Sequence, residues 1–93
     1  MAISLLYMIA MQILIVDDDH STLTMLRLKL SRIAGRVTAT SDASAALAAL
    51  AQTPFDWLIV DGQMSPIDGF ELAAKAKAVR PDIKIVMVSG FYQ

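Results

Sequence analysis

The sequence contains no cysteine, carries almost no net charge and has no apolar stretch long enough to cross a membrane. Without cysteine the chain forms no disulfide and no thiolate metal site. A formal net charge of -1, with Lys and Arg scattered along the chain, gives no electrostatic footprint for nucleic acid. No repeat, low-complexity tract or interdomain linker interrupts the 93 residues. The sequence therefore predicts one small domain.

The most apolar stretch of the chain is residues 1–10, which is shorter than the roughly 20 residues that a bilayer requires. It also lacks the basic start and the cleavage site of a secretory signal. Because Met11 directly precedes the first predicted strand, the simpler interpretation is that translation begins at Met11 and that residues 1–10 are an upstream extension. The alternative is an additional strand or a membrane-surface anchor. We therefore expect an apolar N-terminal extension at 1–10 and a domain at 11–93.

Three runs of large apolar residues each end abruptly in an acid or a hydroxyl. Such runs fit strands that are buried on both faces, as in a parallel sheet covered by helices. Open α/β folds place their ligand sites at the carboxyl ends of the strands, so these polar groups should meet at one edge of one sheet. Each carboxylate alone could be a turn residue or a helix cap, but capping does not explain the joint pattern. The runs are 13–16, followed by Asp17, Asp18 and Asp19; 57–60, followed by Asp61; and 85–88, followed by Ser89.

Helical spacing and helix-breaking residues separate these runs. The first helix should begin at His20, which we expect to be a solvated helix-start residue rather than a metal ligand. Residues 36–40 alternate between apolar and polar and predict a short edge strand. The first helix has an apolar stripe and two further apolar residues that lie off it. These two residues predict that the helix contacts a second element besides the sheet. The stripe is Leu23, Leu26, Leu30 and Ile33, the residues off it are Met25 and Leu28, and Gly35 is the expected C-terminal stop.

Two more helices complete the alternation. Ser41 or Asp42 can cap an alanine-rich helix that contains Leu47 and Leu50 and ends at Pro54. Asp68 can cap the next helix, with Phe70, Ala73, Ala74 and Lys77 arranged around it, and Pro81 stops it. The resulting order of strand, helix, strand, helix, strand, helix, strand predicts a parallel sheet with right-handed crossovers.

At this point the sequence resembles a response-regulator receiver domain, from Gln12 to the C-terminus. The resemblance is carried by the acidic end of the first strand, the Asp61 strand end, the 64–69 loop with its Asp68-Gly69 pair, and Val88-Ser89-Gly90. It implies an α/β flavodoxin-like (CheY-like) three-layer αβα sandwich with a parallel sheet of family order 2-1-3-4-5. In this chain the fold would be truncated after the fourth strand, without the family's final helix, strand and helix.

The resemblance also implies a function and a site. Asp61 matches the residue that accepts a phosphoryl group from a histidine kinase or phosphotransfer protein in cytoplasmic two-component phosphorelay signalling, and the domain itself is not an enzyme. Asp17 and Asp18 match the acidic pair that holds Mg²⁺ together with Asp61, and the main-chain carbonyl of Gln63 matches the third protein ligand. Ser89 matches the hydroxyl that bonds the phosphoryl oxygen. The chemistry agrees, because converging carboxylates need protons or a cation, Mg²⁺ prefers oxygen ligands, and a carboxylate can accept a phosphoryl group.

Two departures from the family pattern modify these expectations. Ser65 separates Met64 from Pro66, whereas the family has proline directly after this methionine, so we expect a changed loop conformation. The chain also ends soon after the fourth strand, without the family lysine that pairs with the phosphoryl group and the aromatic residue that moves on activation. The fourth strand would then be an open edge, and we expect self-association through it.

Two functional classes follow. The first is a phosphoacceptor signalling domain, which the acids and Ser89 favour. The second is a non-phosphorylated, receiver-like protein-interaction or dimerisation module, which the missing lysine favours. A small-molecule hydrolase or flavin protein on the same fold is disfavoured, because the sequence lacks a nucleophile–base pair and a phosphate-cradling glycine loop. We expect no direct contact with nucleic acid or a membrane.

Overall fold

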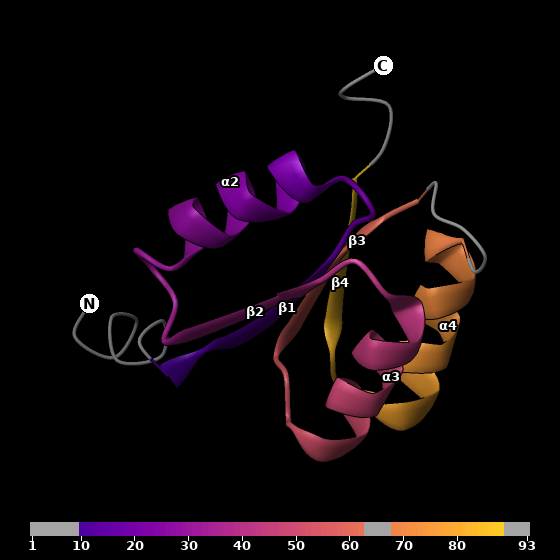
Figure 1. The fold of residues 1–93 in the computed structure, drawn as a ribbon. Helices are drawn as coiled ribbons and strands as arrows, with labels where there is room; N and C mark the ends of the chain where they lie inside the picture. The colour runs from indigo at the N-terminus through magenta and orange to yellow at the C-terminus, as the bar shows by residue number, and fades with distance from the viewer. Residues whose placement is uncertain (1–9, 63–67, 89–93) are drawn as a thin grey trace.

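The structure, a computed structural model, describes residues 10–62 and 68–88. Within these residues the chain alternates between strand and helix as the sequence predicts (Figure 1). The elements are β1 (Gln12–Val16), α2 (His20–Leu30), β2 (Arg36–Thr40), α3 (Ala43–Gln52), β3 (Trp57–Asp61), α4 (Gly69–Val79) and β4 (Lys84–Val88).

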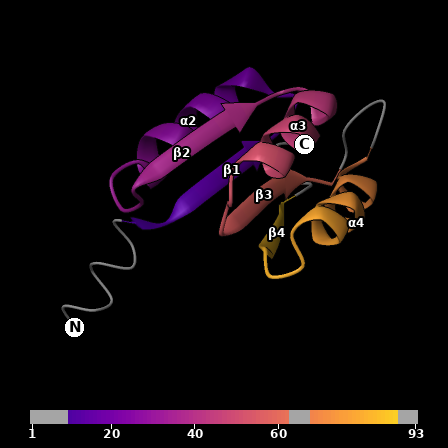
Figure 2. The same ribbon diagram turned by 90° about the horizontal axis from the view of Figure 1, so that it is seen from below.

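The strands form one parallel sheet in the order β2-β1-β3-β4. This order agrees with the first four positions that the family resemblance implies. Helices α3 and α4 cover one face of the sheet and α2 covers the other, which gives three layers (Figures 1 and 2). The α/β sandwich predicted from the sequence is therefore confirmed for the described residues.

Both faces of the central strands are apolar, because successive side chains of a strand point to opposite faces. Leu14, Val16, Leu58 and Val60 point toward α3 and α4 and are completely buried. Alanines on both helices let the backbones approach the sheet and each other. The opposite face carries Ile13, Ile15, Trp57 and Ile59, with Leu23 and Leu26 of α2 packed on it.

An aspartate caps the N-terminus of each described helix. The side chains of Asp42 and Asp68 accept hydrogen bonds from backbone N–H groups of α3 and α4, as the sequence predicts. Asp19 caps α2 in the same way, accepting from the backbone N–H of Thr22 at 3.0 Å and from the Thr22 hydroxyl. These hydrogen bonds lower the pKa of Asp19, the hydroxyl contributing most. The side chain of Asp19 therefore caps α2 and is not one of the acids grouped at the edge of the sheet.

The end of α2 differs from the prediction. The helix stops at Leu30, before Ile33 and well before the predicted stop at Gly35. The hydroxyl of Ser31 donates to the carbonyl of Arg27 at 2.6 Å, and Ile33 N–H donates to Leu30 O in a tight turn. A serine that bonds the backbone competes with the continuation of a helix. Consequently Ile33 leaves the buried stripe and is 49% exposed.

The structure defines which face of α4 is buried. Gly69, Leu72 and Ala76 face the core, whereas Phe70 is 67% exposed. Of the residues that the sequence arranged around α4, Phe70, Ala74 and Lys77 are exposed and Ala73 is half-buried, while Leu72, which was not among them, is its largest buried residue. By contrast, Met25 and Leu28 are exposed on α2, as expected for residues off its apolar stripe.

Candidate functional site

Asp17, Asp18 and Asp61 gather at the carboxyl edge of the sheet. Asp17 directly follows β1 and Asp61 is the last residue of β3, and these strands are paired in register through Val16 and Val60. Oxygen atoms of the three carboxylates all lie within 4.8 Å of one another. The prediction that the acids of separate strands meet at one edge of one sheet is therefore confirmed.

Two of these acids are buried, while the third is exposed. Asp17 and Asp61 are only 1% and 2% exposed. Oδ1 of Asp17 accepts a hydrogen bond from the backbone N–H of Asp19 at 2.9 Å, but its buried Oδ2 has no hydrogen-bond partner within residues 10–62 and 68–88. Burial raises the pKa of Asp17, and the charges of Asp61 and Asp18 raise it further, against the lowering effect of the Asp19 N–H. Among the described residues, the Asp19 N–H therefore compensates the charged form of Asp17 only in part.

The arrangement fits a hard divalent cation. Magnesium takes oxygen ligands, uses one or two carboxylates and keeps several waters, and the orphaned Oδ2 of Asp17 is an oxygen of this kind. Asp17, Asp18 and Asp61 could hold such an ion. The remaining predicted site residues, Gln63 and Ser89, lie outside the described residues, as does the 64–66 loop with its displaced proline.

The backbone on either side of Asp61 is held by two neighbouring elements. Gly62 N–H donates to Val88 O at 2.9 Å, which ties the end of β3 to the end of β4. Gly69 N–H donates to Gly62 O at 3.3 Å at the start of α4. A Cβ atom on Gly69 would lie only 2.1 Å from the carbonyl oxygen of Asp61. In the sequence Gly69 stands out only as part of the Asp68-Gly69 pair, and this contact could not be predicted, since a single glycine does not reveal what approaches it.

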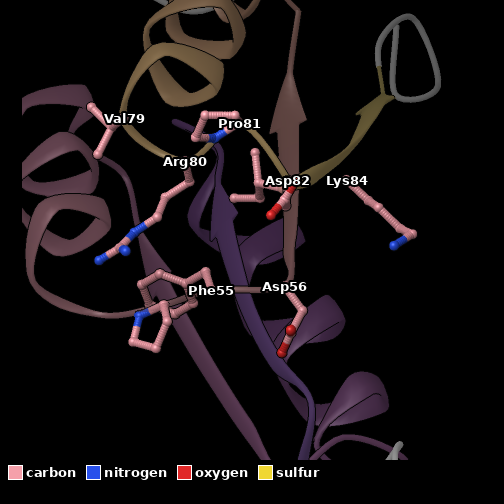
Figure 3. Close-up of a pocket in the computed structure, with 9 residues that line it drawn as sticks. Phe55, Asp56, Val79, Arg80, Pro81, Asp82 and Lys84 are labelled. Atoms are coloured by element: carbon pink, nitrogen blue, oxygen red, sulfur yellow. The ribbon is translucent and has the colours of Figure 1, made fainter.

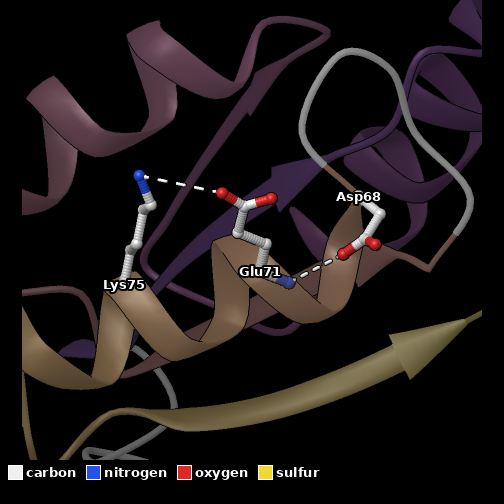
Figure 4. A network of polar contacts seen from close by, with 3 residues as sticks. All are labelled: Asp68, Glu71 and Lys75. Carbon is white, nitrogen blue, oxygen red and sulfur yellow. Dashed lines mark hydrogen bonds and ion pairs between the residues drawn. The ribbon is translucent and has the colours of Figure 1, made fainter.

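The first turn of α4 is fixed beside this contact. Oδ1 of Asp68 accepts from the backbone N–H of Glu71 at 2.8 Å, and Glu71 faces Lys75 with 4.0 Å between Oε2 and Nζ (Figure 4). The exposed ion pair contributes little, because water screens it. The cap does more, because it satisfies a helix N–H that would otherwise lack a partner. Asp68 therefore helps to set where α4 begins, next to Asp61.

A cavity of about 400 Å³ lies at the other end of the strands from the acidic edge (Figure 3). Its polar groups are largely engaged in holding the fold together. Arg80 Nε donates to Leu50 O at 2.9 Å at the end of α3, and Asp56 Oδ2 accepts from Gln12 N–H at 2.8 Å at the start of β1. The cavity thus lies where helix ends and strand starts are tied together, away from the acidic edge.

Replacing Asp17 by asparagine is expected to raise stability in the absence of Mg²⁺ and to reduce the stabilisation that Mg²⁺ provides. Without the ion, the variant should be more stable by about 0.5–2 kcal/mol, because an uncompensated charge has been removed. With excess Mg²⁺, the native chain should gain more stability than the variant, because it keeps the ligand. Thermal unfolding in EDTA and in Mg²⁺ measures both effects. Asp42→Asn, at an exposed helix cap, is the matched control and should show no Mg²⁺ effect; equal Mg²⁺ stabilisation of Asp17→Asn would contradict the prediction.

Comparison with known proteins identifies similar chains. The family model described as "Response regulator receiver domain" matches residues 13–93. The response regulator receiver protein CpdR of Brucella abortus is 34% identical over 86% of this chain and 67% of its own length. The virulence sensor protein BvgS of Bordetella bronchiseptica is 37% identical over 75% of this chain, but that match covers only 6% of BvgS.

A solved structure agrees with these matches. The crystal structure of a CheY-like response regulator receiver domain protein from Methanospirillum hungatei superposes with a TM-score of 0.83 at 31% identity, covering 90% of this chain and 67% of that one. Among the described helices, none has the length and apolar character needed to cross a membrane.

Proposed function

Because the chain belongs to the response regulator receiver domain family, we propose that it accepts a phosphoryl group on Asp61 in two-component signalling. The donor would be a histidine kinase or a phosphotransfer protein, and the setting would be the cytoplasm. The observation that carries the proposal is the gathering of Asp61 with Asp17 and Asp18 within 4.8 Å at the carboxyl edge of the sheet. Similarity to a sensor protein and to a receiver protein supports the assignment.

In the proposed reaction an oxygen of the Asp61 carboxylate forms the new bond to phosphorus. The bond from phosphorus to the donor nitrogen breaks, and the nitrogen keeps the electron pair. Asp61 is suited to this role because β3 and the first turn of α4 fix its backbone. Asp17, Asp18 and the carbonyl of Gln63 would hold Mg²⁺, which when bound offsets the negative charge around the acceptor and the phosphoryl oxygens.

The proposed output is a change in contacts after transfer. The Ser89 hydroxyl would gain a hydrogen bond to the phosphoryl oxygen only in the phosphorylated state. A contact made in one state alone is what a two-state switch requires. The domain would then signal through its changed surface and would not catalyse a reaction on a substrate of its own.

The test is intact-mass spectrometry of the chain after incubation with acetyl phosphate and Mg²⁺. We expect a mass gain of one phosphoryl group that requires Mg²⁺ and is absent in Asp61→Asn. Asp56→Asn, an acid at the other end of β3, is the matched control and should still be phosphorylated. Absence of any gain in a chain shown to be folded by circular dichroism would reject the phosphoacceptor function.

A second candidate is a receiver-like interaction module that works without phosphorylation. It is favoured by the position of β4, which is an edge strand of the described sheet and carries Val86, 37% exposed. Unpaired edge strands can pair with another chain, so we propose self-association through β4. Sedimentation velocity should then show concentration-dependent dimers that Val86→Pro weakens and Asp61→Asn leaves unchanged. A chain that stays monomeric at all concentrations would reject this candidate.

A further inference from the structure

The lysine and arginine side chains of this protein fall into two groups with different surroundings. One group, on or next to α4 and β4, is engaged within the fold: one member pairs with an acid, two donate to main-chain carbonyls and one lies over an aromatic ring. These are Lys75, Lys77, Arg80 and Lys84. The other group, at the end of α2 and the start of β2, is exposed and has no such contact in the described part of the chain. We call it the basic corner: Arg27, Lys29, Arg32 and Arg36.

No acid of the sequence neutralises the basic corner. All nine Asp and Glu residues are among the described residues, and none forms an ion pair with these four side chains. Residues 20–41, which include the corner, contain no Asp or Glu. Asp19 and Asp42, which flank this stretch, cap α2 and α3, and Asp56 just before β3 accepts from the backbone N–H of Gln12. The basic corner is therefore a surface of uncompensated positive charge.

The strand that begins in the basic corner is an edge of the sheet. Among the described strands β2 pairs only with β1, and Figure 2 shows it at the outer side of the sheet. At the two ends of β2, Arg36 N–H and Thr40 O form hydrogen bonds with the main chain at either end of β1. Because backbone groups alternate in direction along a strand, Val37 and Ala39 turn their N–H and C=O groups outward. The family order 2-1-3-4-5 adds its further strand beside β4, on the opposite side of the sheet.

We propose that an extended, acidic segment of a partner protein binds along the outer side of β2, with its carboxylates against the basic corner. The outward backbone groups of Val37 and Ala39 can pair with the backbone of such a segment, as strands do when they add to a sheet edge. Arg32 and Arg36 lie where this strand begins, and their guanidinium groups can donate to its carboxylates. The charges select the partner, and the strand pairing holds it extended.

Other polyanions and a second copy of the chain fit this surface less well. Nucleic acids and anionic lipids cannot pair with the outward backbone groups of β2 as a strand does. Residues 20–41 also contain no Phe, Tyr or Trp on which bases could stack. The β2 strand of a second copy carries Arg36 and no acid, so it would not supply the negative charge. The inference does not rest on phosphorylation of Asp61.

Fluorescence anisotropy of a labelled peptide tests the role of charge. The probe is a short peptide with blocked ends that alternates Glu and Thr, and it is titrated with the native chain and with two charge-reversed variants. Arg32→Glu/Arg36→Glu should bind it at least roughly tenfold more weakly, whereas Lys75→Glu/Lys84→Glu, with the same change in net charge away from β2, should stay within about twofold of the native chain. All four side chains are exposed, so both variants should fold, as far-UV circular dichroism checks. Equal weakening in both variants, or no binding to the native chain, would overturn the proposal.

Amide hydrogen exchange measured by NMR tests the strand pairing without any substitution. Saturating peptide should slow exchange of the Val37 and Ala39 N–H groups by roughly fivefold or more, because these groups become hydrogen-bonded. A peptide of the same sequence with N-methylated backbone amides keeps the charges but cannot pair as a strand, and it should give no such protection. The proposal fails if bound peptide leaves both amides unprotected, or if they become protected with rising protein concentration in the absence of peptide. It also fails if a short oligothymidylate or phosphatidylglycerol vesicles bind more tightly than the peptide.

Discussion

Gly69→Ala is expected to lose most of the phosphorylation at Asp61 and to destabilise the fold. The added Cβ would lie 2.1 Å from the carbonyl oxygen of Asp61 and 2.7 Å from the Cα of Gly62. Both are backbone atoms, so no side chain can move aside, and α4 or the end of β3 must shift. Overpacking of this kind costs about 1–3 kcal/mol or more, which exceeds the gain in helix propensity from glycine to alanine. The acceptor carboxylate would move with the strand end, away from Asp17 and Asp18.

The measurement is the rate of phosphorylation by acetyl phosphate, followed by intact mass, together with urea unfolding. We expect at least a roughly tenfold lower rate, because a misplacement of about 1 Å can cost far more than this in positioning. Ala74→Gly is the matched control: it also weakens α4, by about 0.5–1 kcal/mol, but at an exposed position. The control should keep its phosphorylation rate. A Gly69→Ala variant as fast as the native chain would show that the contact does not position Asp61.

Leu58→Ala is expected to have the largest effect on stability of any substitution considered. Leu58 of β3 is completely buried, in the larger core cluster with Leu14, Leu50 and Leu72. Truncating a buried leucine costs about 2–5 kcal/mol, through lost burial and the cavity left behind. Small domains have a total stability of only about 5–15 kcal/mol, so this variant should be close to unfolding at 37 °C. Urea unfolding monitored by far-UV circular dichroism measures the difference.

The neighbouring residue provides the matched control for Leu58. Ile59 has the same number of carbon atoms but points to the opposite face, which α2 covers only partly, and it is incompletely buried. Ile59→Ala should therefore cost less than Leu58→Ala, by about half. Equal losses would mean that the two faces of β3 are equally well covered in solution.

The sequence predicted every described strand and helix, because two simple signals coincide in this chain. Apolar runs that end in an acid or a hydroxyl mark three strands, alternation marks the edge strand, and aspartates mark the helix caps, as at Asp42 and Asp68. The errors occurred where a local hydrogen bond overrode periodicity. Ser31 ends α2 early by bonding Arg27 O, so the stripe that included Ile33 was too long.

The site was predictable for the same reason as the fold, since parallel strands bring their carboxyl ends to one edge. The meeting of Asp17, Asp18 and Asp61 could therefore be predicted from their positions at the strand ends, and the structure brings them together. Their roles as metal ligands and phosphoacceptor came from the family resemblance and remain proposals. The role of Gly69 could not be assigned, because it depends on how closely α4 approaches a carbonyl of β3, and no pattern of residue types encodes that distance. The metal role of Gln63 and the switching role of Ser89 remain predictions.

The order of the strands has a consequence for synthesis on the ribosome. The first strand made, β1, occupies an interior position between β2 and β3, so it acquires its second neighbour only after residue 57 has been translated. The exit tunnel encloses a further stretch of nascent chain, which delays this pairing. Until then, an apolar strand without its partner is exposed to chaperones and to other nascent chains. Slowing of translation after β3 has left the tunnel should therefore favour correct folding, whereas a pause while β3 is still enclosed should favour aggregation.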